Sequence, residues 1–143
     1  MARINFFTED NTYTLKHKTI IRKWIEATIV AEGYKLEELN FILCSDDYLL
    51  RINQDFLQHD DYTDVITFDN SEELKMIVGD IFISIDRIKE NAKNFGTTML
   101  HELCRVIIHG TLHLLGYKDK TKQAKTLMTN KEDFYLERLE FKG

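Results

Sequence analysis

An apolar run near residue 110 constrains this chain more than any other feature, because it carries two histidines four residues apart. His109 and His113 interrupt an otherwise hydrophobic segment that includes Leu103, Val106, Ile107, Ile108, Leu112, Leu114 and Leu115. A run of this composition and spacing is typical of a buried helix. Residues four apart project from one helix face, one turn apart. The run therefore predicts a helix that presents two imidazoles side by side.

The residues that follow this helix offer a third ligand. Gly116 lies three residues after His113, where a glycine commonly ends a helix in the left-handed conformation and turns the chain sharply. Such a turn can bring Asp119 back toward both rings. Two imidazole nitrogens and a carboxylate oxygen suit Zn²⁺ and leave a fourth position for water, as in catalytic sites. We predict that His109, His113 and Asp119 are the metal ligands and catalytic residues; two ordinary core histidines are the alternative.

The spacing is close to that of the metalloprotease helix H-E-x-x-H-x-x-G-x-x-H. Gly110 stands where that motif has its general-base glutamate, and Asp119 occupies the slot of the third histidine. A metal can still lower the pKa of water and polarise an oxygen without that glutamate. The helix therefore predicts metal-assisted hydrolysis, with phosphodiesters as better candidate substrates than peptides.

Three segments together resemble the bacterial YbeY family, which consists of metal-dependent single-strand endoribonucleases of ribosomal RNA maturation. They are HGTLHLLGYKD, YTDVITF and GDIFIS. The corresponding family patterns are H-G-x-L-H-L-x-G-Y-D-H, P-T-D-V-L-S-F and G-D-I, and the similarity is densest from Asn53 to Asp119. The resemblance implies single-stranded ribosomal RNA as substrate and the ribosome or small-subunit proteins as partners.

This sequence departs from the family pattern at three positions. Asp119 replaces the third histidine, Tyr62 replaces a proline, and Leu57 replaces an arginine that the family usually has. Aspartate still binds metal but makes the site more anionic, which weakens the Lewis acidity of the ion. Leucine removes a fixed positive charge that would hold a phosphate.

Composition sets the broad class of protein. The 143 residues fit one domain, 1–143, and a hydrophobic content of 43% supplies a core for it. We expect a cytoplasmic protein without membrane contact, because no segment reads as a membrane span or signal peptide. Cys44 and Cys104 are expected to be reduced core thiols. The net charge of −5 argues against a general nucleic-acid binder, so RNA contacts would have to rest on a few lysines.

The pattern of apolar residues predicts the element order β-α-β-α-β-β-α-α-α. This order corresponds to an α+β or mixed α/β fold, with one mixed sheet of about four strands, about five helices and a metalloprotease-like metal-site helix. The expected strands are 3–7, 39–44, 63–69 and 76–84. The expected helices run from residue 11 or 12 to about 31, from Ser45 to about 56, from 84 or 86 to about 95, from 97 or 98 through the histidine run, and from about 122 to 141.

Particular residues carry further expectations. Trp24 should lie in the core, and Gly79 should mark a bulge or a close backbone approach. Asp64 is either an ordinary acid at the start of a strand or a hydrogen-bond partner of a ligand histidine. The acids of the last helix are expected at the surface; they are Glu132, Asp133, Glu137 and Glu140.

Four residues are candidates for substrate contact: His59, Lys118, Lys120 and Lys122. The lysines could form a phosphate-binding rim beside Asp119, or simply a solvated helix start. Three functions follow from the whole sequence, in order of preference. The first is an endoribonuclease, the second is a ribosome-associated binding factor with a mainly structural metal, and the third is a metallopeptidase.

Overall fold

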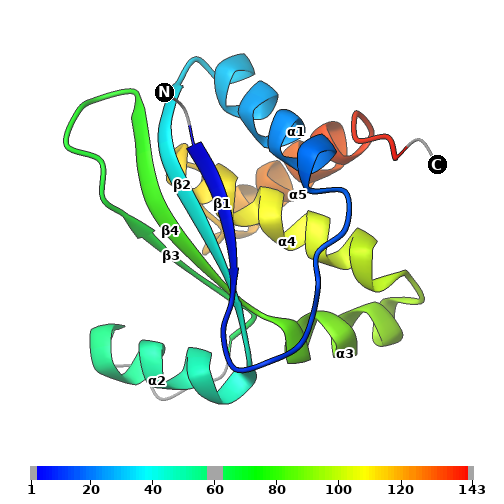
Figure 1. Cartoon of the computed structure of the whole chain (residues 1–143). Helices are drawn as coiled ribbons and strands as arrows, with labels where there is room; N and C mark the ends of the chain where they lie inside the picture. Colours follow the sequence, from blue (N-terminus) through cyan, green and yellow to red (C-terminus); the bar gives the residue numbers. More distant parts are fainter. Residues whose placement is uncertain (1–2, 58–62, 142–143) are drawn as a thin grey trace.

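The computed structural model describes residues 3–57 and 63–141, which build one four-stranded mixed sheet with helices on both sides (Figure 1). The strands are β1 (Arg3–Thr8), β2 (Lys35–Cys44), β3 (Val65–Asp69) and β4 (Met76–Ser84). Their order is β1-β2-β4-β3, with β1, β2 and β4 parallel and β3 antiparallel to β4 at one edge. The predicted α+β class and element order are confirmed.

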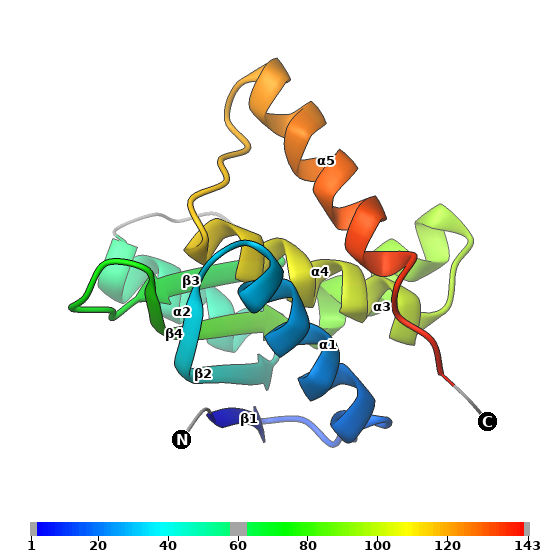
Figure 2. The ribbon, with the colours of Figure 1, turned by 90° about the horizontal axis from the view of Figure 1, so that it is seen from above.

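The helices form a thick layer on one face of the sheet and a thin one on the other. They are α1 (Lys18–Ala31), α2 (Asp46–Leu57), α3 (Ile85–Phe95), α4 (Met99–Leu114) and α5 (Lys122–Leu136). α1 and α4 pack against the strands and α5 lies outside α4, whereas α2 lies on the opposite side of the sheet (Figures 1 and 2). None of the helices in the described part of the chain is long and apolar enough to cross a membrane.

Alternation along the strands divides the apolar residues between these two layers. In β4, Ile81 and Ile83 point toward α4 and are fully buried in the main core, while Phe82 packs in a second cluster with Phe68. Trp24 is in the main core, as predicted, and its indole N–H donates to the Tyr135 carbonyl at 2.7 Å.

Two glycines bring α4 close to the sheet. A Cβ on Gly79 would lie 2.8 Å from the carbonyl oxygen of Phe68 and 2.9 Å from Cδ1 of Leu114. A Cβ on Gly110 would lie 3.0 Å from Cγ2 of Ile81. The close backbone approach expected at Gly79 is therefore confirmed. The irregularity in strand register that a bulge produces lies between Leu36 and Glu38 of β2 instead. The helix α4 can rest on β3 and β4 because neither glycine carries a side chain.

The helix boundaries were partly predicted. Ser45, Ser84 and Thr98 each accept a hydrogen bond from a backbone N–H three residues later, as caps do. The predicted start of α1 at residue 11 or 12 was wrong. The Asn11 side chain instead accepts from the Tyr13 backbone N–H and donates to two carbonyls, which holds this segment in a turn. The predicted end of α5 at 141 was also wrong, because the helix ends at Leu136.

Candidate metal site

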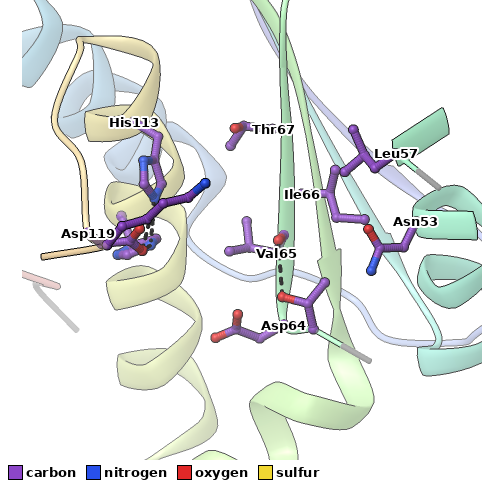
Figure 3. Close-up of a pocket in the computed structure, with 11 residues that line it drawn as sticks. Asn53, Leu57, Asp64, Val65, Ile66, Thr67, His113 and Asp119 are labelled. Atoms are coloured by element: carbon purple, nitrogen blue, oxygen red, sulfur yellow. Dashed lines mark hydrogen bonds and ion pairs between the residues drawn. The ribbon is translucent and has the colours of Figure 1, made fainter. Parts of the chain in front are cut away.

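The end of α4 and the loop after it bring His109, His113 and Asp119 together. The two Nε2 atoms are 3.1 Å apart, and Oδ2 of Asp119 lies 3.2 Å from Nε2 of His113 and 3.4 Å from Nε2 of His109. Gly116 has φ of 101°, so the predicted left-handed turn is present and returns the chain to the rings. Figure 3 shows Asp119 beside the His113 ring on the side of α4 that faces β3.

The other nitrogen of each ring has an acceptor. Nδ1 of His113 is 2.9 Å from the Tyr117 carbonyl, and Nδ1 of His109 is 2.5 Å from Oε2 of Glu132 on α5. A ring that donates from Nδ1 presents the lone pair of Nε2. Both rings therefore have a partner that selects the form in which Nε2 is free to bind a cation.

Glu132 is itself held in place, since its side chain is only 8% exposed and accepts from Nη1 of Arg105 at 2.8 Å. The other guanidinium nitrogen, Nη2, donates to Asp133 at 2.7 Å. The surface placement predicted for Glu132 was wrong, whereas Asp133, Glu137 and Glu140 are exposed as predicted. A signal was available: Met128, Glu132 and Tyr135 recur at helical spacing on the buried face of α5, so a carboxylate interrupts an apolar stripe.

The charges around the site favour a cation. Burial of the His109 ring would lower its pKa, but the hydrogen bond and charge of Glu132, together with the charges of Asp119 and Asp64, raise that pKa above its ordinary value. Burial raises the pKa of Asp64, and this rise is only partly opposed by His109. The carboxylates that raise the pKa of His109 would also favour a divalent cation beside its ring.

The donor set fits a divalent transition metal. One ligand atom from each of His109, His113 and Asp119 can be chosen so that all lie within 4.8 Å of one another. Two imidazole nitrogens and one carboxylate oxygen form a three-ligand set that leaves a coordination position for water or substrate. The residues predicted as ligands are thus assembled in a geometry that could hold such an ion.

These three side chains lie in a cavity of about 630 Å³ between α4 and the edge strand β3. The opposite wall includes Asn53, Leu57 and Asp64, and the backbone of β3 runs through it (Figure 3). The Asp64 carboxylate points into the space between β3 and α4, and its backbone carbonyl accepts from the Ser84 N–H. No described contact joins the Asp64 side chain to a ring nitrogen of His109, where Glu132 is bound instead.

The predicted substrate contacts are only partly brought together. Lys120 lines the cavity, whereas Lys118 and Lys122 are exposed and lie outside its wall. His59 lies outside the described residues. Leu57, which replaces the arginine of the family pattern, lines the cavity and is 40% exposed.

Comparison with known proteins places this chain in a family. The profile described as Endoribonuclease YbeY matches residues 3–140. Curated proteins named Endoribonuclease YbeY include those of Cytophaga hutchinsonii (55% identical over 93% of both chains), Karelsulcia muelleri (50%, 93% of both) and Porphyromonas gingivalis (41%, 93% of this chain and 87% of the relative). A Thermotoga maritima protein solved in solution superposes with a TM-score of 0.65 at 30% identity, covering 96% of this chain and 89% of its own. The chain belongs to the YbeY endoribonuclease family.

Proposed function

We propose that this chain is a metal-dependent endoribonuclease that hydrolyses single-stranded ribosomal RNA during its maturation in the cytoplasm. The observation that carries the proposal is the convergence of His109, His113 and Asp119 in an open cavity beside an edge strand. Family membership supports the reaction class, because relatives with 41–55% identity carry the name Endoribonuclease YbeY. The ribosome or small-subunit proteins are the partners that this role implies.

We assign Nε2 of His109, Nε2 of His113 and Oδ2 of Asp119 as the ligands of a Zn²⁺ ion. Zinc suits two imidazoles and a carboxylate, although other divalent transition metals share this preference. When bound, the ion would polarise a phosphate oxygen and lower the pKa of a water molecule. The ligand roles of these residues rest on their geometry and on the acceptors at both Nδ1 atoms.

The remaining wall of the cavity supplies groups for substrate. Among the described residues, β3 pairs with β4 alone, so its other edge offers backbone groups to an extended strand of RNA. We infer that Lys120, which lines the cavity, contacts a phosphate, and that Asp64 on the opposite wall accepts a proton from the attacking water. With a net charge of −5, binding through so few cations should weaken strongly with added salt.

Leu57 favours a second candidate function. It lines the cavity at the position where the family pattern has arginine, and an aliphatic side chain cannot neutralise a phosphate. A ribosome-associated factor that keeps the metal for structure would tolerate this change. The third candidate, a metallopeptidase, is opposed by Gly110, which faces Ile81 and Thr67 and offers no carboxylate to act as base.

The test is cleavage of single-stranded RNA by the purified chain. Ribosomal RNA fragments, an unrelated RNA and a duplex are each incubated with the enzyme, with a chelator, and after add-back of Zn²⁺ or Mn²⁺. His113→Ala controls for contaminating nuclease. Cleavage that disappears with the chelator and in the variant supports the enzyme. No cleavage of any RNA by metal-loaded protein, together with retained binding to ribosomal RNA, would overturn it in favour of the binding factor.

A further inference from the structure

The carboxylate of Glu32, just beyond the end of α1, joins two segments that are far apart in the sequence. Its side chain is only 12% exposed. The Tyr117 hydroxyl donates to Oε1 at 2.6 Å, the Tyr135 hydroxyl donates to Oε2, and Nζ of Lys131 lies 3.2 Å from Oε2. Tyr117 belongs to the loop after α4, while Lys131 and Tyr135 belong to α5. The loop and α5 are thus both held by the one carboxylate of Glu32.

Each of these two segments also supplies the acceptor for one ligand histidine. The Tyr117 carbonyl accepts from Nδ1 of His113 at 2.9 Å, and Oε2 of Glu132 lies 2.5 Å from Nδ1 of His109. Glu132 directly follows Lys131 and stands one helical turn before Tyr135. The groups that orient both rings are therefore attached to the residues that Glu32 holds.

Glu32 is not needed merely to attach these segments to the rest of the fold. The Trp24 indole already ties α1 to α5 through the Tyr135 carbonyl at 2.7 Å. The Tyr34 hydroxyl donates to the Leu115 carbonyl at 2.9 Å and so anchors the end of α4. Glu32 adds a single carboxylate that contacts both Tyr117 and the helical turn from Lys131 to Tyr135. The Glu32 side chain lies outside the walls of the metal-site cavity.

We propose that Glu32 is a positioning residue for the metal site, acting through Tyr117 and α5 on the orientation of His113 and His109. The inference rests on the proposed ligand role of these histidines. Outer partners that orient metal-binding imidazoles commonly change metal affinity by about 10- to 100-fold when they are removed. Glu32 contacts neither ring directly, but it acts on the partners of both, so we expect its removal to weaken metal binding about tenfold.

The test measures Co²⁺ affinity by competition with a chromogenic chelator, together with the visible spectrum of the Co²⁺ protein. Glu32→Ala should bind Co²⁺ about tenfold more weakly and shift the visible bands, since the ligand field depends on ring orientation. Glu32→Gln keeps one acceptor and should lose less. Tyr117→Phe removes only the hydroxyl and keeps the carbonyl, so it should weaken binding in the same direction. Glu26→Ala, at an exposed position of α1, is the matched control and should behave like the wild type.

A double variant makes the test specific. If Glu32 acts through Tyr117, the double variant Glu32→Ala/Tyr117→Phe should lose less binding free energy than the sum of the losses in the two single variants. Wild-type affinity and spectrum in Glu32→Ala, even with a lowered unfolding temperature, would overturn the proposal and leave Glu32 as a structural contact. If Glu32→Ala fails to fold, Glu32→Gln and Tyr117→Phe decide by the same readouts. Failure of the wild type to bind Co²⁺, Zn²⁺ or Mn²⁺ would instead refute the metal site itself.

Discussion

Oε2 of Glu132 lies 2.5 Å from Nδ1 of His109, while the neighbouring Asp133 shares the same arginine without contacting the ring. The two acids are adjacent on α5 and both bind Arg105. They differ in burial, because Glu132 is 8% exposed and Asp133 is 51% exposed. Both acids form an ion pair with Arg105, but only the buried Glu132 also contacts the His109 ring.

Replacing Glu132 should weaken metal binding. Without its carboxylate, the His109 ring loses the acceptor that orients it, so we expect Glu132→Ala to lower Zn²⁺ affinity by about 10- to 100-fold. Chelator competition measures this. Asp133→Asn is the matched control and should keep wild-type affinity. Equal losses in both variants would show that Arg105, and not the contact with His109, is what matters.

Asp119 should determine both how tightly the site binds the ion and how strong a Lewis acid the bound ion is. Removing it in Asp119→Ala takes away one of three ligand atoms, and we expect a loss of affinity of at least about 100-fold, larger than for an outer partner. Asp119→His restores a ligand that is neutral, so the ion should be a stronger Lewis acid and RNA cleavage faster than in the wild type. Titration with Zn²⁺ and single-turnover cleavage measure the two effects. A slower Asp119→His enzyme with full metal occupancy would contradict this account.

The contact between α4 and the sheet predicts unequal costs for two glycine substitutions. Gly79→Ala places a methyl group 2.8 Å from a backbone oxygen, which cannot move without shifting β3. Gly110→Ala meets the flexible end of Ile81 at 3.0 Å. We expect Gly79→Ala to lower the free energy of unfolding by about 2–3 kcal/mol and Gly110→Ala by about 1 kcal/mol. Urea unfolding measures both, and a reversed order would show that Ile81 is less able to move than the strand.

The two cysteines should be unreactive in the folded protein. Burial raises the pKa of Cys104 to about 12, and burial together with nearby acids such as Asp10 and Asp46 raises the pKa of Cys44 to about 12. At about pH 8 only on the order of one thiol in ten thousand is then a thiolate. A disulfide reagent should therefore modify neither residue until guanidinium unfolds the chain. Rapid modification of the native protein would contradict the buried placement.

The stability of the fold should depend on pH through Glu32. Burial alone would raise the pKa of this carboxyl, but the hydrogen bonds from Tyr117, Tyr135 and Lys131 lower it below its ordinary value. A pKa that is lower in the folded state contributes stability that is full above the unfolded pKa, about 4.5, and is lost as the pH falls through the folded value.

Glu32→Gln should consequently lower the free energy of unfolding at about pH 7 by about 1–3 kcal/mol, the cost of weakening hydrogen bonds to a charged group. The difference from the wild type should shrink toward zero as the pH falls well below 4.5. Denaturant unfolding across this range measures it, with Glu26→Gln as control. A difference that stays constant with pH would mean that the charge of Glu32 does not contribute.

The parts of the candidate site that could be predicted are those whose residues lie close together in the sequence. His109, His113, Gly116 and Asp119 lie within eleven residues, so helix periodicity and a left-handed glycine are sufficient to bring them together. Caps such as Ser84 were predictable for the same reason. Strand order could not be read in this way, because the parallel pairs β1–β2 and β2–β4 join segments that are distant in the sequence, and only β3 and β4 are neighbours in the chain.

Glu132 and Glu32 escaped prediction because each acts across the tertiary structure. Glu132 is 23 residues from His109, and Glu32 is 85 residues from Tyr117. On a surface helix an acid is usually solvated, and only the packing of α5 on α4 converts Glu132 into a buried acceptor. The start of α1 was wrong for a local reason, since the side-chain hydrogen bonds of Asn11 compete with helix formation.

The position of α5 after the three candidate ligands in the sequence has a consequence for biosynthesis. His109, His113 and Asp119 leave the ribosome before Glu132 does, so a nascent chain displays all three candidate ligands while His109 still lacks its acceptor. Docking of α5 is then the event that completes the candidate site. A chain truncated before residue 132 would keep the whole H-G-x-L-H motif and still lack the contact that orients its first histidine.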